Sequence, residues 1–305
     1  MSGGTSTFYK NDVITIENLV GPDAQPVPGT TTSIRFDLRN NGRDPVPKLV
    51  VDFFDTQGLT TTVNCAGGKK LSSSSCEFDN VPSLDSRNFA ITFQIPGPDE
   101  IKGPITLTFN YEISYDYHGS RRIILPIIDT SLESQPVASY QIADPSVGPI
   151  SADFDPPLGR TVQKDNNQNV QEYWGVKGDS FQIKTKIDMV ADTTVGDVQP
   201  VVLKAGHVTL SIGSLAVDSQ KRCDFKGSGG KISSSFDIVA SGNPNSLVCS
   251  FISPSFSGAE KIVSVDANYD YTIQILRSAT IQITPQKNIG GGTSGSGTSG
   301  NGQIV

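Results

Sequence analysis

The sequence has few of the residues that most catalytic and metal centres use. Its 305 residues include two histidines, four cysteines, two methionines and one tryptophan. Neither His118 nor His207 lies beside a nucleophile or a second metal ligand in the sequence, so we interpret both as surface histidines. The glycine-rich run Gly227–Lys231 lacks the spacing of a phosphate-binding loop, and the nucleophile-elbow and zinc-protease motifs are absent. We therefore expect no enzyme, no cofactor and no metal site.

Basic residues and long apolar runs are also scarce. The chain has 24 Lys and Arg against 31 Asp and Glu, a net charge of −7, which disfavours binding to nucleic acid or to anionic lipid. Its longest apolar run, Ile123–Ile128, is much shorter than the roughly 20 residues that cross a bilayer as a helix. We expect no nucleic-acid partner and no membrane insertion in this segment.

Glycine and proline are abundant instead, at 30 and 19 residues. They separate short segments in which apolar and polar residues alternate, the pattern of half-buried strands. Clear examples are Ser33–Arg39, Phe89–Ile95, Phe181–Ile187 and Thr280–Thr284. No segment of ten or more residues has helical periodicity. The predicted class is all-β, and His118-Gly119-Ser120 is one of the predicted turns.

An internal repeat with a spacing of 158 residues relates the two halves of the chain. It aligns Asn110-Tyr111-Glu112 with Asn268-Tyr269-Asp270, and Cys65 with Cys223. In each copy we predict a tyrosine-rich strand, a short turn and an apolar return strand. Repeated all-β blocks of this length are typical of tandem Ig-like sandwiches, in which the two tyrosines would occupy tyrosine-corner positions.

We therefore predict two tandem Ig-like antiparallel β-sandwich domains. Residues 1–7 are expected to be a flexible N-terminus, residues 8–130 the first sandwich, and residues 131–286 the second, with an inserted loop at about 150–178. A short polar link is expected to hold the two end to end as a rod. Residues 287–305 are rich in Gly, Ser and Thr, and we predict a disordered linker to further sequence.

The four cysteines are divided equally between the repeats. Pairing Cys65 with Cys76 and Cys223 with Cys249 is the one connectivity of three that respects the repeat. Zinc is disfavoured because the spacings differ from CxxC patterns. We expect each disulfide to staple a loop or a sheet edge, unlike the inter-sheet bridge of antibody domains. Disulfides indicate an oxidising compartment, so the predicted location is extracellular or at the cell surface.

Four carboxylates and one aromatic pair remain as candidates for binding. Asp144, Asp153, Asp155 and Asp165 offer oxygen ligands that suit calcium, but without a recognised spacing, and we prefer to interpret them as solvated acidic loops. Glycosidase chemistry would need two carboxyl groups held together across a cleft, which a sequence does not establish.

Tyr173 and Trp174 end a long polar segment of the second repeat and are candidate partner contacts, because aromatic residues on loops bury a large area on binding. The alternative, which we prefer, is that the pair folds back onto the sheet and anchors the insertion.

The run Asp37–Gly42, followed by Val50–Asp55 and a closing Asp266–Tyr271, resembles CARDB-like Ig domains. These are adhesion-type modules common in prokaryotic, especially archaeal, cell-surface proteins. The resemblance covers most of residues 30–128 and 180–284, and it implies a structural or adhesive module outside the cell, without catalysis.

We therefore expect a structural or adhesive segment of a larger cell-surface or secreted protein, which serves as a spacer, a filament subunit or a partner-binding rod. Protein partners or self-association are expected, and strand exchange between copies is one route to filaments. The alternative is a carbohydrate-binding or calcium-dependent recognition module, which requires exposed aromatic side chains or a carboxylate cluster at one end of a sandwich.

Overall fold

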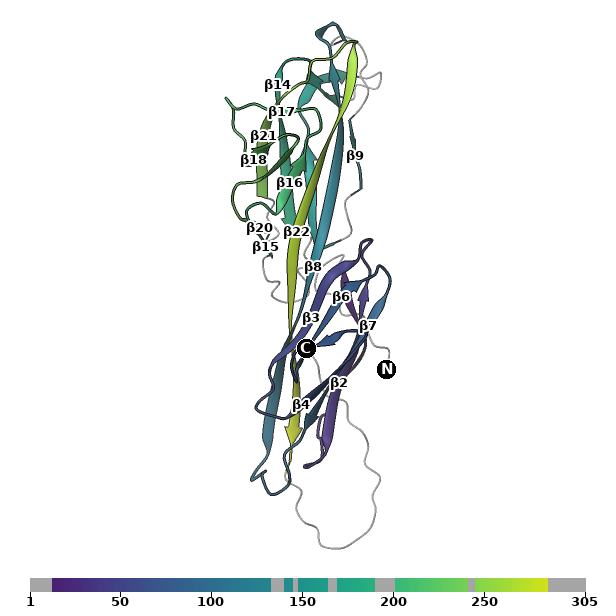
Figure 1. The fold of residues 1–305 in the computed structure, drawn as a ribbon, viewed down its shortest axis with the longest axis vertical. Helices are drawn as coiled ribbons and strands as arrows, with labels where there is room; N and C mark the ends of the chain where they lie inside the picture. The colour runs from purple at the N-terminus through teal and green to yellow at the C-terminus, as the bar shows by residue number, and fades with distance from the viewer. Residues whose placement is uncertain are drawn as a thin grey trace. The chain divides into compact units, whose positions relative to one another are not determined.

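The computed structural model describes residues 13–132, 140–144, 148–163, 169–189, 201–240 and 245–284. These residues form β-strands and one short 3₁₀ helix, η1 (Thr130–Leu132), with no α-helix among them (Figure 1). The predicted all-β class is confirmed. The expected N-terminal segment 1–7, the tail 287–305 and Asp165 lie outside the described residues.

The alternating segments found in the sequence form strands with one buried face. In β2 (Thr31–Asn40), Ile34, Phe36 and Leu38 are buried and the residues between them are more exposed. The neighbouring strand β7 (Ser86–Gln94) pairs with β2 in antiparallel register, with Phe36 opposite Phe89. This period of two is the reason that each sheet has an apolar and a polar face.

The described residues form two compact units. Unit 1 contains residues 13–116 and 273–284, and unit 2 contains residues 117–272. We expected one division, between residues 130 and 131. The structure instead has two divisions, and both fall inside strands. β8 (Ile105–Ile128) and β22 (Glu260–Ile283) each contribute residues to both units.

Unit 1 is a sandwich of two sheets. One sheet has the order β1-β2-β7-β4, and the other contains the end of β22, the start of β8, then β3, β6 and β5. Aromatic rings from the two sheets stack in the core. The ring centroids of Phe53 in β3 and Phe89 in β7 are 5.7 Å apart, and those of Tyr111 in β8 and Phe36 in β2 are 5.9 Å apart. In addition to β2, β7, β8 and β22, the strands of unit 1 are β1 (Ile14–Val20), β3 (Val46–Asp55), β4 (Thr61–Ala66), β5 (Lys69–Lys70) and β6 (Ser75–Val81).

Unit 2 is a second sandwich-like unit. One sheet has the order β10-β14-β21-β17, and the other contains β18, β19, β16, the start of β22 and the end of β8. The Tyr269 hydroxyl of β22 donates to the Ile150 carbonyl of β10 at 3.2 Å and so links the sheets. The strands are β10 (Ile150–Asp155), β14 (Ser180–Met189), β16 (Val208–Ser211), β17 (Ala216–Val217), β18 (Phe225–Ser228), β19 (Lys231–Ser234) and β21 (Asn245–Ile252).

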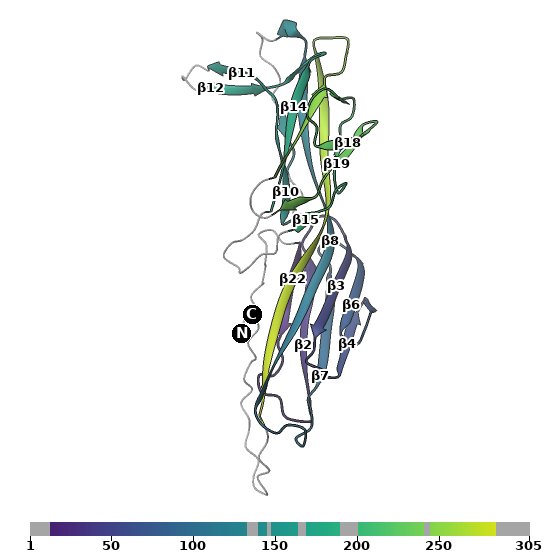
Figure 2. The same ribbon diagram turned by 90° about the vertical axis from the view of Figure 1, so that its left-hand side faces the viewer.

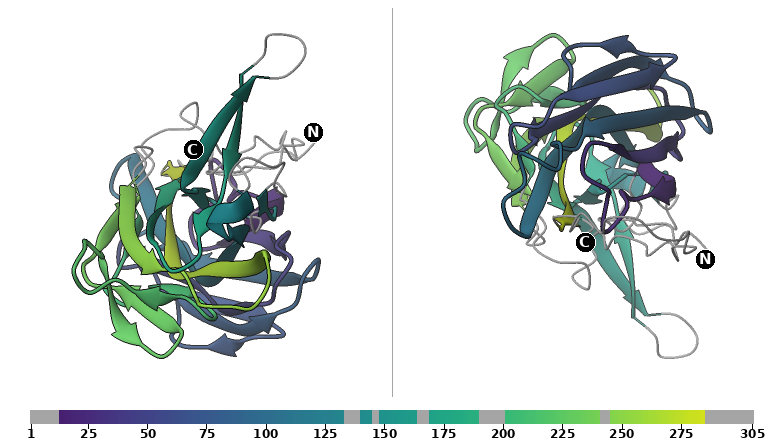
Figure 3. Two further views of the ribbon diagram at one scale, coloured as in Figure 1. Left: turned by 90° about the horizontal axis from the view of Figure 1, so that it is seen from above. Right: turned by 90° about the horizontal axis from the view of Figure 1, so that it is seen from below.

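Smaller elements complete unit 2. β9 (Gln141–Ile142) and β13 (Gly175–Val176) pair with the end of β8. β15 (Val201–Leu203) and β20 (Ile238–Ala240) form a two-stranded sheet. The hairpin of β11 (Leu158–Gln163) and β12 (Asn169–Tyr173) projects from the remaining strands of unit 2 (Figures 2 and 3).

The predicted turn at His118-Gly119-Ser120 is wrong, and so is the predicted hairpin that it would close. These residues lie inside β8, a continuous strand of 24 residues, and β22 is equally long. In unit 2, Gly119 is needed because the ring of Tyr269 fills the space where another residue would place its Cβ. The glycine therefore serves side-chain packing between strands, where we had expected a change of chain direction.

Both predicted disulfides are present, and no cysteine is free. Cys223 faces Cys249 at the edge of the sheet that contains β21, as expected for an edge staple. Cys65 is the penultimate residue of β4 and Cys76 lies in β6, with 5.7 Å between their Cα atoms. β4 is the edge strand of its sheet, so this disulfide lies at a sheet edge as expected. Because β6 belongs to the other sheet, the disulfide joins the two sheets of unit 1, and the expectation that it is not an inter-sheet bridge is wrong.

Neither tyrosine of the repeat forms a tyrosine corner. The Tyr111 hydroxyl is buried without a hydrogen-bond partner in the described structure. The hydroxyl of Tyr269 bonds Ile150, which is far away in sequence. Burial raises the pKa of both Tyr111 and Tyr269 to about 12, because an ionised phenol is poorly solvated in the core.

Candidate functional site

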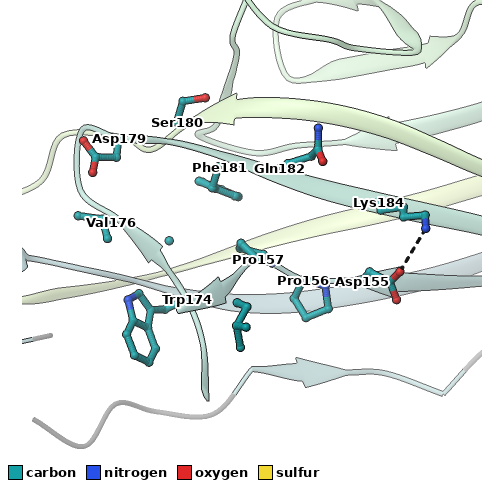
Figure 4. Close-up of a pocket in the computed structure, with 12 residues that line it drawn as sticks. Asp155, Pro156, Pro157, Trp174, Val176, Asp179, Ser180, Phe181, Gln182 and Lys184 are labelled. Atoms are coloured by element: carbon teal, nitrogen blue, oxygen red, sulfur yellow. Dashed lines mark ion pairs between the residues drawn. The ribbon is translucent and has the colours of Figure 1, made fainter. Parts of the chain in front are cut away.

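Unit 2 has a pocket of about 660 Å³ at the base of the β11–β12 hairpin (Figure 4). Trp174 and Phe181 line it together with Pro156, Pro157 and Leu158, and the polar side chains of Asp155 and Lys184 face it as well. In Figure 4, Trp174 lies at one end and the ion pair of Asp155 with Lys184 at the other. The pocket therefore combines an apolar end with a charged end.

Backbone constraints explain why the chain forms a pocket here. Pro156 and Pro157 follow β10 directly, and proline cannot donate to a β-ladder, so pairing stops and the chain turns outward into the hairpin. The returning chain passes Trp174 and then forms β13, where Gly175 lies opposite Ile127 of β8. A side chain at Gly175 would collide with Ile127 and Phe181. Because Gly175 has no side chain, the backbone of β13 packs closely against Ile127 and Phe181, and both residues of β13 line the pocket.

The apolar end is formed by partly and fully buried rings. Trp174 is only 5% exposed, whereas Leu158 is 54% exposed at the rim. Phe181 is half-buried, and its ring centroid lies 6.2 Å from that of Phe251 on the neighbouring strand. Because Leu158 and Phe181 retain exposed surface, an apolar face of a ligand would gain burial there.

The charged end is held by cross-strand pairs. Asp155 accepts a hydrogen bond from the Lys186 ammonium at 2.7 Å and lies 3.8 Å from the Lys184 ammonium. The three side chains are partly exposed, between 34% and 45%. A partly solvated ion pair of this kind adds little stability, so Lys184 can turn toward a ligand at small cost.

Asp144, Asp153 and Asp155, the candidate calcium ligands that the structure describes, do not come together. Asp153 pairs with Arg121 at 3.5 Å, Asp155 pairs with two lysines, and Asp144 is exposed on the segment after β9. Among the described residues no group of three or more His, Cys, Asp or Glu side chains is placed to hold a metal ion. The described candidate carboxylates are therefore engaged separately and do not form one cluster.

The two candidate partner contacts have different environments. The burial of Trp174 supports the interpretation that it anchors the inserted segment. Tyr173 is half-buried, and its ring packs edge-on against Tyr140 at 4.9 Å between centroids. Of the pair, Tyr173 keeps more surface available for a partner.

The sequence did not predict that both histidines contact the same residue, Asp270, on the surface of unit 2. His118 Nδ1 lies 2.8 Å from an Asp270 carboxylate oxygen, and His207 Nδ1 lies 3.4 Å from the Asp270 carbonyl oxygen. All three residues are exposed. They come from β8, β22 and the turn before β16, and only the pairing of these strands brings them together.

A second pocket, of about 360 Å³, lies on the outward face of the β1-β2-β7-β4 sheet in unit 1. Asp37 is one of the residues that line it: the Asn18 side-chain amide donates to Asp37 at 2.6 Å, and the Asn88 side-chain amide donates from the next strand. Asn18 has a φ of 50° at an irregularity in β1, which turns its side chain toward Asp37. The sequence contains no spacing that signals this group, because it assembles across three strands.

No helix in the described part of the chain is both long enough and apolar enough to cross a membrane. The two disulfides are typical of proteins that fold in an oxidising environment.

No known family model matches the chain, and no curated protein matches it in sequence. Solved structures that resemble it include the secreted serine protease VesC from Vibrio cholerae, with 12% identity and a TM-score of 0.19 over 81% of this chain and 50% of that one. Red sea bream transglutaminase matches with 13% identity and a TM-score of 0.22, over 88% of this chain and 31% of that one.

A biofilm associated protein BSP domain matches with 6% identity and a TM-score of 0.21, over 94% of this chain and 69% of that one. The chain thus spans half or less of the first two proteins.

Proposed function

We propose that the chain is a structural and adhesive segment of a larger cell-surface or secreted protein. In this proposal unit 1, which contains both ends of the described chain, connects the segment to the rest of the protein, and unit 2 presents a binding surface. One observation carries this proposal. In the described structure, unit 2 is a stretch inserted between two parts of unit 1, and the chain passes into and out of it only through β8 and β22.

Three further features support a load-bearing and partner-binding role. The disulfide of Cys65 with Cys76 fastens the two sheets of unit 1 to each other. The disulfides also suit an extracellular location. Unit 2 carries the projecting β11–β12 hairpin and the larger pocket, so the features available to a partner are concentrated in the inserted unit.

Single-molecule pulling through tags at the two chain ends tests the structural role. Because unit 2 is inserted into unit 1, force is transmitted first through unit 1. We expect a resolved force peak for unit 1, followed by a second peak for unit 2. A chain that extends without a resolved peak, or in which unit 2 opens before unit 1, would contradict the proposal.

The adhesive role is tested with beads that carry the chain through a C-terminal tag. We expect beads bearing the intact chain to adhere to one another or to glycan-coated surfaces. Beads bearing a variant in which a Gly-Gly link replaces residues 159–172 should adhere less. Equal adhesion of both bead types would contradict the assignment of the binding surface to this part of unit 2.

The pocket favours carbohydrate recognition as a second candidate function. A sugar has apolar C–H faces and many hydroxyls, and the pocket places Phe181 and Leu158 close to Lys184 and Gln182. We expect binding on a glycan array that a chelator does not reduce, and that the substitution Lys184→Ala weakens. Lys186→Ala is the matched control, because Lys186 pairs with the same Asp155 carboxylate but does not line the pocket.

Unchanged binding in Lys184→Ala would remove this pocket as the sugar site. Loss of binding with chelator alone would instead indicate a calcium-dependent module.

A further inference from the structure

We infer that the last strand of each sequence repeat completes the unit built mainly from the other repeat, and that a second copy of this chain can therefore supply the same strand by exchange. The inference does not use the pocket or the adhesive role, although it starts from the same division of the chain into two units as the proposed function. It rests on the composition of the two units and on the burial of the exchanged strands.

In unit 1 the exchanged strand is the end of β22, residues 273–283. Its alternate residues enter the core: Ile273, Ile275, Ala279, Ile281 and Ile283 are each no more than 2% exposed. The backbone N–H of Gln282 also donates to the Ala24 carbonyl at 2.9 Å. Unit 1 without this strand would expose apolar side chains of its core together with an unpaired strand edge.

In unit 2 the exchanged strand is the end of β8, residues 117–128. Ile123, Leu125 and Ile127 are each no more than 1% exposed. Ile123 pairs with Ile142 of β9, and Ile127 pairs with Gly175 of β13. This strand is therefore held by backbone pairing as well as by burial of its side chains.

No disulfide joins the two halves of the sequence. One disulfide lies wholly within the first half and the other wholly within the second. Each unit thus depends on a non-covalent strand from the other half. A second copy offers identical strands, so exchange between copies keeps the contacts of the exchanged strand within its unit and changes which chain donates that strand.

The protein concentration during folding is expected to determine whether the single-chain form or the strand-exchanged form predominates. Within one chain the donor strand is tethered, and its high effective concentration favours the single-chain form. Chains that fold together at high concentration are expected to exchange strands and form dimers or longer assemblies.

The first experiment cuts the native protein between the halves. A protease recognition sequence is placed within residues 133–139, and the purified protein is cleaved there. We expect both fragments to co-elute as one species and to separate only in denaturant. Fragments that separate under native conditions would overturn the inference.

A matched pair of variants identifies the strand responsible. In the cleaved protein, Ile281→Asp buries a charge in unit 1 and should weaken fragment association by about tenfold or more. Gln282→Asp is the control, because the adjacent side chain is exposed, and association should be unchanged. An equal effect of both substitutions would contradict the assigned strand.

The second experiment tests exchange between copies. Two intact chains with different affinity tags are unfolded together with their disulfides intact, refolded at several concentrations, and analysed by size-exclusion chromatography with light scattering. We expect dimers that contain both tags, in a fraction that rises with concentration. Refolding to monomer alone at every concentration would overturn the exchange between copies, even if the cleaved halves remain associated.

Discussion

The ring of Tyr269 in β22 lies against the main chain of Gly119 in β8, within unit 2, in the space that any other residue would fill with a Cβ. Tyr269 is fully buried, and its hydroxyl bonds the Ile150 carbonyl at 3.2 Å. A glycine inside a strand weakens the strand by itself, and here an aromatic ring from the neighbouring strand covers it. This pair explains why β8 continues where the sequence predicts a turn.

We predict that Gly119→Ala lowers the free energy of unfolding by about 1 to 3 kcal/mol, as overpacking of a filled core does. The added methyl group would overlap the Tyr269 ring, and the ring cannot move without losing its bond to Ile150. Urea unfolding measured by circular dichroism provides the test.

Gly103→Ala is the matched control for this substitution, because a Cβ there meets nothing within 4 Å. In a double-mutant cycle, Gly119→Ala and Tyr269→Ala should cost less together than the sum of the two single changes. A stability of Gly119→Ala equal to that of the parent protein would show that the ring is not held against the glycine.

The fluorescence of Trp174 should be that of a buried indole. It is the one tryptophan of the sequence, so the emission reports this site alone, and the side chain is 5% exposed. We expect blue-shifted emission and weak quenching by acrylamide in the native protein, with a red shift on unfolding. Red-shifted, strongly quenched emission in the native protein would instead indicate an exposed contact residue.

The disulfide of Cys65 with Cys76 should stabilise unit 1. Replacing both cysteines by serine should lower the free energy of unfolding by about 3 kcal/mol, the loss of loop-closure entropy expected for a separation of 11 residues. Replacing Cys223 and Cys249, separated by 26 residues, should cost slightly more, about 3.5 kcal/mol.

The two serine variants differ in where stability is lost. The change at Cys65 and Cys76 should increase hydrogen exchange in β4 and β6 of unit 1, and the other change should increase it around β21 of unit 2. Exchange that rises equally throughout both units after either change would contradict this localisation.

The sequence predicts the local features of this fold well. The alternation in Ser33–Arg39 and Phe181–Ile187 depends only on neighbouring residues and the burial of one face, and both segments form strands. The cysteine pairing followed from the repeat, and the structure has it. In each case the decisive information lies within one segment or one repeat.

Features that depend on partners distant in sequence were not predicted. Gly119 has the local signature of a turn, and its role depends on Tyr269, which lies 150 positions away. The candidate site could not be predicted for the same reason. Phe181 and Lys184 line a pocket only because the β11–β12 hairpin brings Pro156 and Trp174 close to them. Alternation shows which face of a strand is buried but does not show which strand lies next to it.

Alkaline pH should destabilise the protein through its buried tyrosines. An unfolded tyrosine ionises near pH 10.0, whereas burial raises the pKa of Tyr111 and Tyr269 to about 12. Between these values the unfolded chain binds fewer protons than the folded chain, so stability is complete below pH 10 and falls as pH rises toward 12. The loss should be on the order of 2 to 3 kcal/mol for each of the two residues.

Unfolding by urea across this pH range, followed by circular dichroism, measures the loss, and phenolate absorbance reports the ionisation. Tyr111→Phe is the informative variant, because the hydroxyl it removes is buried without a partner in the described structure. It should raise the free energy of unfolding at neutral pH by about 1 kcal/mol and should reduce the alkaline loss. An alkaline loss of the same size in Tyr111→Phe and the parent protein would show that Tyr111 ionises normally and that its hydroxyl reaches solvent.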